Sequence, residues 1–319
     1  MAIVAVVSAV GLAVDDRVLV GAPIWAKPFK FAISFGVYCL SLAWLLSLFP
    51  RRRRVAWWSG SLVGLACLAE QGFITLQVIR GTRSHFNNAT PFDSAVNKAM
   101  AVTVVLLWVS TLVVALLLLR VRIVDRASAW AMRAGITQAL LGAAVGFLMV
   151  LPTPDQQDDS PVAGAHSVGV PDGGPTMPLS DWSTTGGDLR IPHFFGMHAL
   201  QLLPLLVMVL AALAPRYARL ADERVRTRLV LLASGVYAAV FALLLWQALR
   251  GQPLIHPDGM TLAAALAILV VAVLGTYGCL RVPTRSRAEA GDAAVASTAV
   301  VGTGVADPAV ADAPEELVS

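Results

Sequence analysis

Seven predominantly apolar runs, each long enough to cross a lipid bilayer, constrain the fold of this chain most strongly. A helix rises about 1.5 Å per residue, so about 20 apolar residues span the roughly 30 Å hydrocarbon layer. Of the 319 residues, 57% are hydrophobic and only 14% are charged, whereas soluble domains carry about 25% charged residues. The pattern predicts an all-α, multi-pass membrane protein and excludes an ordinary soluble domain. The runs cover residues 31–49, 55–79, 99–119, 129–151, 193–214, 229–249 and 260–280.

An eighth apolar run, residues 2–14, comes first and is shorter than a full span. No basic residues precede it, as they would in a secretory signal peptide, so we interpret it as a short first transmembrane helix. The predicted fold therefore has eight transmembrane helices.

The arginines predict the orientation of these helices. Basic residues concentrate on the cytoplasmic side of membrane proteins, and 16 of the 24 basic residues fall in alternate connections of this chain. These connections and both termini are therefore expected to be cytoplasmic. The chain has 21 Arg and three Lys, a bias typical of GC-rich bacterial genomes, which indicates a bacterial inner (plasma) membrane. The richer connections hold Arg51–Arg54, Arg120–Arg133, Arg216–Arg228 and Arg281–Arg287.

Short matches between the two halves of the chain indicate an internal duplication. The segment Gln77-Val-Ile-Arg80-Gly81 matches Gln247-Ala-Leu-Arg250-Gly251, and three further pairs of helix ends match at offsets between 161 and 165. We interpret these matches as two tandem four-helix repeats related by an axis along the membrane normal. The repeats cover residues 1–126 and 127–287, with an extracytoplasmic loop at 152–192 and a disordered cytoplasmic tail at 288–319.

Three polar residues at similar membrane depth form the first candidate site. Glu70 lies near the bilayer midplane, where a carboxyl is costly and usually functional, and where burial favours its neutral form. His198 and Gln201 are three residues apart on one helical face at a comparable depth. We expect the helices at 55–79 and 193–214 to be neighbours, with Glu70, His198 and Gln201 as catalytic candidates.

All five histidines fall on the predicted extracytoplasmic side, and imidazole suits metals, haem and proton transfer. His85, His193 and His198 are the candidate metal ligands, with His85 above the Glu70 cavity. The polar segments around this site supply candidate substrate contacts. They are Arg80, Arg83, Arg190 and Asp188. Residues 181–190 lead directly into the histidine-bearing helix and are expected to form a lid.

Several stretches, among them Lys27-Pro-Phe-Lys-Phe and His193-Phe-Phe-Gly-Met-His, resemble an uncharacterised family of bacterial multi-pass inner-membrane proteins. That resemblance implies no activity. The architecture of two four-helix halves is also similar to the haem A synthases, which carry haem-ligating His on the second and fourth helix of each half. In this chain the helices at 31–49, 99–119 and 260–280 contain no His.

Three functions follow from these patterns. The first is a metal- or haem-dependent membrane enzyme or redox protein, with a divalent metal or haem as cofactor. The second is a proton-coupled small-molecule transporter with Glu70 as proton carrier, and the third is a non-catalytic assembly or sensor protein. Expected partners are the lipid bilayer and a small-molecule substrate from the extracytoplasmic side, with no nucleic acid. The absence of Walker, Rossmann and HExxH patterns argues against ATP hydrolysis, dinucleotide binding and zincin chemistry.

The orientation gives the first testable prediction. In intact cells, an impermeant thiol reagent should label an Ala165→Cys variant and should not label Arg52→Cys or Asp222→Cys. Opening the cells should make both protected positions reactive. Labelling of Asp222→Cys in intact cells would contradict the predicted orientation.

Overall fold

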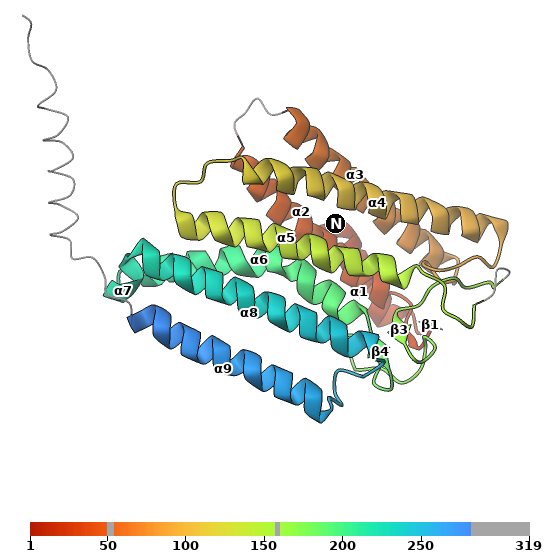
Figure 1. Ribbon diagram of the computed structural model, residues 1–319. Coiled ribbons are helices and arrows are strands. Elements are labelled where there is room, and N and C mark those ends of the chain that lie inside the picture. The colour runs from red at the N-terminus through yellow and green to blue at the C-terminus, as the bar shows by residue number, and fades with distance from the viewer. Residues whose placement is uncertain (50–53, 157–159, 282–319) are drawn as a thin grey trace, which may run out of the picture. The chain divides into compact units, whose positions relative to one another are not determined.

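The computed structural model of the protein describes residues 1–49, 54–156 and 160–281. The described helices belong to one unit, Met1–Leu280. The predicted tail at 288–319 and residues 51–53 of the first arginine cluster lie outside the described residues. Figure 1 shows long, roughly aligned helices with short irregular segments at their ends.

The described chain is all-α apart from two very short antiparallel strand pairs. The strands are β1 (Val18–Leu19) with β2 (Ala22–Pro23) and β3 (Ser167–Val168) with β4 (Gly187–Asp188). The helices are α1 (Ala2–Val14), α2 (Ala26–Ser47), α3 (Arg54–Ile79), α4 (Pro91–Leu119), α5 (Arg126–Met149), α6 (Arg190–Leu213), α7 (Ala218–Ala221), α8 (Glu223–Leu249) and α9 (Gly259–Arg281).

Seven of the helices in the described residues are long and apolar enough to cross a membrane: α2 to α6, α8 and α9. This confirms a multi-pass helical membrane protein. The helix α1 is too short to be counted with them. It packs beside α2, where Gly11 leaves room for the Trp25 ring and Gly36 lies against Met1. Because Gly36 is near the middle of α2, α1 accompanies only the first half of that helix.

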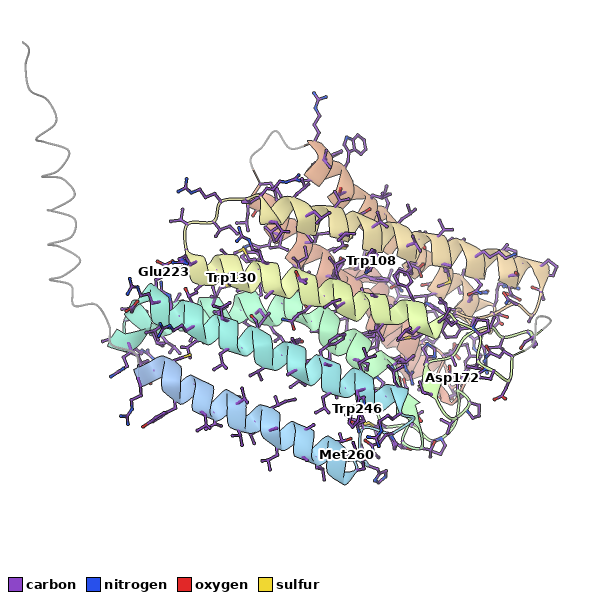
Figure 2. The ribbon with its side chains drawn as sticks, in the orientation of Figure 1. Trp108, Trp130, Asp172, Glu223, Trp246 and Met260 are labelled. Carbon is purple, nitrogen blue, oxygen red and sulfur yellow. The ribbon has the colours of Figure 1, made fainter. Side chains whose placement is uncertain are left out.

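Three of the helices begin directly after a residue whose side chain caps the helix N-terminus. Thr90, Asp125 and Asp222 precede α4, α5 and α8, and each side chain accepts a hydrogen bond from a backbone N–H of the first turn. Such caps satisfy donors that have no partner within the helix. Glu223 and Asp172 mark opposite ends of the bundle in Figure 2. We call the end with Asp172, where the segments 80–90, 150–156, 160–189 and 250–258 lie, the loop end.

The packing centres on α5, which contacts α4 on one side and α6 and α8 on the other. The backbones of α5 and α6 meet at Gly142 and Gly196. A Cβ on Gly142 would lie 2.5 Å from Met197 N, and one on Gly196 would lie 2.5 Å from the Gly142 Cα. Any larger residue at either position would push the helices apart. Small residues at helix crossings allow this close approach in membrane proteins.

The two Gln-x-x-Arg-Gly segments form the same corner at the ends of α3 and α8. Gly81 and Gly251 both have a φ of +70°, and their N–H groups bond to Val78 O and Ala248 O. The N–H groups that follow bond back to Gln77 O at 3.0 Å and Gln247 O at 3.2 Å. These are the two bonds of a glycine-terminated helix cap.

The arginine before each glycine pairs with an aspartate at the start of the next helix. Arg80 Nη1 lies 2.5 Å from Asp93 Oδ1, and Arg250 Nη2 lies 2.5 Å from Asp258 Oδ2. The two corners are alike in these features, and the tandem repeat stays a prediction. The two predicted repeats differ most at their first helices, because α1 is short whereas its counterpart α5 is a long, half-buried helix.

Replacing either corner glycine should destabilise the protein. A non-glycine residue at φ +70° costs about 1 kcal/mol or more, so Gly81→Ala and Gly251→Ala should each lower the midpoint of thermal unfolding in detergent. Gly64→Ala is the matched control, because Gly64 is helical and a Cβ there meets nothing within 4 Å. An equal effect of all three substitutions would contradict the corner geometry.

Candidate functional site

A cavity of about 420 Å³ lies inside the bundle towards the loop end, and its lining comes from α2 to α6 and the loops above them. It reaches the surface beside Pro23 and Gly173, which are exposed. Its deeper wall is apolar, with Phe35, Trp108 and Phe147 among the lining side chains. The volume lies in the range of small-molecule sites. Of the predicted site residues, it brings together Glu70, Arg83, His85, Arg190, His193, His198 and Gln201.

Glu70 is the most deeply buried acidic side chain of this cavity, with 1% of its surface exposed. Its Oε1 accepts a hydrogen bond from the Thr103 hydroxyl of α4. Its Oε2 has no hydrogen-bond partner among the described residues. The sequence predicted a partner on α6, whereas the structure provides Thr103 on the neighbouring helix α4.

His198 and Gln201 line the same cavity from α6 and contact each other. The His198 Nδ1 lies 3.4 Å from Gln201 Oε1, and Gln201 Nε2 donates to Ser41 Oγ of α2 at 3.1 Å. His198 is exposed at the side of the bundle. The pair therefore lies on the α2-facing side of α6, and neither residue hydrogen-bonds to Glu70.

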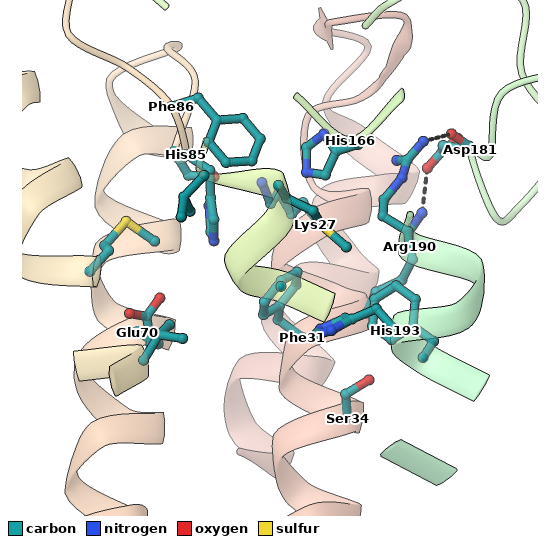
Figure 3. Close-up of a pocket in the computed structure, with 18 of the residues that line it drawn as sticks. Lys27, Phe31, Ser34, Glu70, His85, Phe86, His166, Asp181, Arg190 and His193 are labelled. Atoms are coloured by element: carbon teal, nitrogen blue, oxygen red, sulfur yellow. Dashed lines mark hydrogen bonds and ion pairs between the residues drawn. The ribbon is translucent and has the colours of Figure 1, made fainter. Parts of the chain in front are cut away.

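Three other histidines surround the upper part of the cavity. In Figure 3, His85 lies above Glu70, with His166 and His193 across the cavity. His193 Nδ1 lies 2.8 Å from Gly142 O, and because a carbonyl only accepts, Nδ1 carries the proton. Burial, with the nearby Lys27 and His166, lowers the pKa of His85 well below its usual value. His85 is therefore neutral at physiological pH.

His166 was not a predicted site residue, and it pairs with Asp172 in the loop above the cavity. The Nδ1 of His166 lies 2.7 Å from Asp172 Oδ2, and the backbone N–H groups of His166 and Ser167 also donate to this carboxylate. Burial lowers the pKa of His166, although its bond to Asp172 opposes this shift. Burial raises the pKa of Asp172, but the bonds from His166 and Ser167 outweigh it, so the net shift is downward. A neutral His166 therefore donates to an ionised Asp172.

Lys27 is the second site residue that sequence reasoning missed. Its ammonium lies in the cavity between His85 and His166 (Figure 3) and 5.8 Å from the Phe31 ring centroid. In the described part of the chain, this ammonium has no hydrogen-bond or ion-pair partner. The segment Trp25–Lys30 looks like an ordinary membrane-interface sequence, so no local signal distinguishes Lys27 from Lys30.

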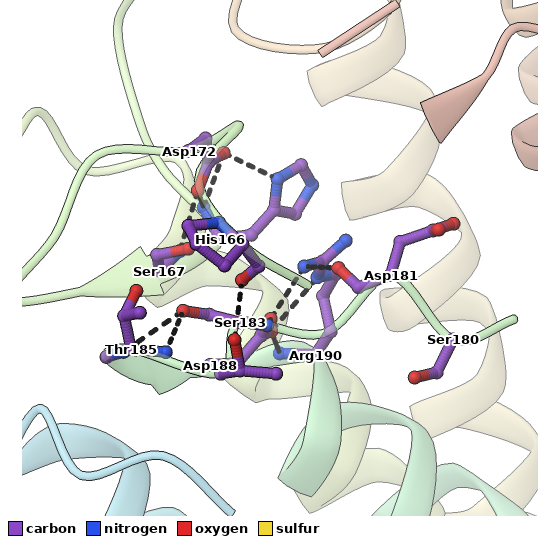
Figure 4. A network of polar contacts seen from close by, with 12 residues as sticks. His166, Ser167, Asp172, Ser180, Asp181, Ser183, Thr185, Asp188 and Arg190 are labelled. Atoms are coloured by element: carbon purple, nitrogen blue, oxygen red, sulfur yellow. Dashed lines mark hydrogen bonds and ion pairs between the residues drawn. The ribbon is translucent and has the colours of Figure 1, made fainter. Parts of the chain in front are cut away.

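The predicted lid, residues 181–190, is fastened to the helix starts by a polar network (Figure 4). Asp188 is 1% exposed and accepts from Arg190 Nε at 2.9 Å and Nη2 at 2.6 Å, and from Ser183 N at 2.9 Å. Arg190 Nη2 also donates to Asp181 O at 2.5 Å, and Lys30 Nζ pairs with the Asp181 carboxylate. Gly187 lets the lid approach α8, since a Cβ there would lie 2.0 Å from Ala248 O.

Two of the predicted substrate contacts lie outside the cavity lining. Arg80 is engaged with Asp93 and Gln77, and its guanidinium lies over the Phe92 ring. Asp188 is enclosed by the lid network. Arg83 and Arg190 do line the cavity.

The metal hypothesis gains no support from the arrangement of donor side chains. Within the described ranges, no three His, Cys, Asp or Glu side chains lie close enough together to hold a metal ion. His85, His193 and His198 line one cavity without forming such a group.

Comparisons with known proteins do not add an identity: no family model, no curated protein and no solved structure matches this chain. The resemblances drawn from the sequence therefore extend only to a multi-pass helical membrane architecture.

The His166–Asp172 pair predicts that the loop loosens on acidification. Both folded-state pKa values lie below their usual values, so the stabilisation is fully present above about pH 6.5 and falls as the pH decreases. Hydrogen exchange of residues 162–175 in nanodiscs should be about tenfold faster at about pH 4 than at neutral pH, after correction for the intrinsic rate. Asp172→Asn should exchange fast at both values. Equal protection of the wild-type loop at both values would contradict the pairing.

Proposed function

We propose that this protein is a proton-coupled carrier that binds a small molecule in the cavity and exchanges a proton at Glu70. The observation that carries the proposal is the Oε2 of Glu70, which has no hydrogen-bond partner within the described part of the chain and belongs to a side chain that is 1% exposed and lines the cavity. A buried carboxyl oxygen without a partner is costly. The free-energy cost of burying this oxygen is smaller if Glu70 is protonated or if a bound molecule supplies a hydrogen-bond partner.

Thr103 suits either protonation state of Glu70. A threonine hydroxyl has one proton and two acceptor sites. When Glu70 is ionised, Thr103 donates to Oε1. When Glu70 is protonated, Thr103 accepts from it and donates to Met100 O, which lies 2.9 Å from its Oγ1. The same contact therefore persists through a protonation cycle, as proton exchange requires.

The route for the proton runs from the loop end. With the orientation that the arginines predict, this end faces the outside of a bacterial inner membrane. His85 and His166 lie along the cavity above Glu70 and are neutral at physiological pH. Neutral imidazoles both accept and donate protons, so they suit proton transfer between the outer solution and Glu70.

Glu70→Gln tests the proposal directly. In proteoliposomes, the infrared spectrum of the wild type should contain a protonated-carboxyl band whose size changes with pH. Glu70→Gln should remove this band while preserving the helical signal, because the amide keeps the shape of the side chain. Thr103→Val should shift the titration, because valine neither donates nor accepts.

Glu223→Gln is the matched control, since Glu223 lies at the other end of the bundle and bonds to Arg126 N at 2.7 Å. It should leave the band unchanged. A titrating band of full size in Glu70→Gln would refute Glu70 as the proton site, as would its loss in Glu223→Gln.

A further inference from the structure

Two residues that line the cavity where α2 faces α6 are also exposed, which indicates an opening at the side of the bundle in addition to the one at the loop end. Val37 of α2 is 40% exposed and His198 of α6 is also exposed, yet both line the cavity. Within the described structure, the hydrogen bond from Gln201 Nε2 to Ser41 Oγ is the single side-chain bond that joins these two helices.

This side opening lies at the depth of the hydrocarbon layer. Val37 is eleven residues into α2 and His198 is eight residues into α6, which places them about 16 Å and about 12 Å from the loop-end starts of their helices. A polar side chain facing lipid at this depth is expensive. The presence of His198 and of the Gln201–Ser41 bond at this depth is explained if a molecule with a polar group passes through the side opening.

The lining of the cavity specifies the chemistry of its occupant. Phe35, Trp108 and Phe147 form an apolar deep wall, which fits a hydrocarbon chain. Near the loop end, the Lys30 and Arg190 cations are matched by Asp181 and Asp188. The Lys27 side chain lies in the same region and forms no ion pair among the described side chains, with Asp172 and Glu70 acting on it only at longer range, so a negatively charged head group would supply the close counter-charge that it lacks.

We infer that the small molecule is a single-chain amphiphile with an anionic head group, and that it enters sideways from the bilayer between α2 and α6. The inference rests on the proposed function and deepens it. The head group binds Lys27, with the ring N–H of the neutral His85 as a further donor. The chain lies along the apolar wall and leaves through the side opening. Carboxylate and phosphate head groups share the required charge.

Photolabelling tests the charge and the chain separately. Diazirine-bearing dodecanoate, dodecyl phosphate and dodecyltrimethylammonium would be added to the protein in nanodiscs, and the labelled peptides mapped by mass spectrometry. The two anions should label α2, α4 and α6 around the cavity, and the ratio between them identifies the preferred head group. Excess dodecanoate should suppress labelling, and acetate or inorganic phosphate should not. Equal labelling of cavity residues by the cation, or suppression by acetate, would overturn the inference.

Two pairs of variants test the head-group site and the side opening. Lys27→Met should reduce anion labelling about tenfold, and Lys98→Met, an exposed lysine of α4, should not. Val37→Trp should block the opening and slow labelling, whereas Leu40→Trp, at a 73% exposed position of the same helix outside the cavity lining, should leave the rate unchanged. Equal rates in the two tryptophan variants would refute lateral entry.

Failure of this inference is distinguishable from failure of the proposed function. Loss of the titrating carboxyl band in Glu70→Gln reports the proton site alone and needs no amphiphile. Anion labelling that depends on Lys27 reports the ligand class alone. If Glu70→Gln removes the titrating band but anion labelling does not depend on Lys27, the proposed carrier is retained and the amphiphile is rejected.

Discussion

The close approach of α5 and α6 at Gly142 and Gly196 determines where the remaining elements of the bundle lie. Because no side chain separates the two backbones, His193 of α6 reaches Gly142 O of α5 directly. With these helices held together, α8 packs against both of them and α4 against the opposite side of α5. The cavity forms where α2, α3 and α4 meet this pair, and it stays open because α2 does not pack closely on α6.

The apolar runs predicted the membrane-spanning helices well, because the bilayer requires backbone polar groups to be paired within each segment. The run at 2–14 is where this reasoning is weakest, since its length is too short for the same argument. Glu70 was recognisable for a related reason: a carboxyl in a membrane helix is so costly that it needs an explanation. The position of His198 and Gln201 on one helical face followed from helical periodicity.

The partners of these residues were not predictable from the sequence. Threonine in a membrane helix commonly bonds to its own backbone, so Thr103 gave no sign that it also contacts Glu70. The pairing of His166 with Asp172 depends on how a long glycine-rich loop folds back over the helix ends, which no periodicity encodes. Arg80 and Asp188 show the reverse case: they look like ligand-binding charges in the sequence, and the structure places both in internal ion pairs outside the cavity lining.

Helix α2 is bonded to both segments that border the openings of the cavity, the lid and α6. Near its start, Lys30 holds the lid through Asp181 and the carbonyl groups of Leu179 and Ser180. Eleven residues further on, about 16 Å along the axis, Ser41 bonds to Gln201. Because a helix is stiff, a movement of α2 at one of these attachments also changes its position relative to the other. The two attachments of α2 therefore link the position of the lid to the width of the gap between α2 and α6.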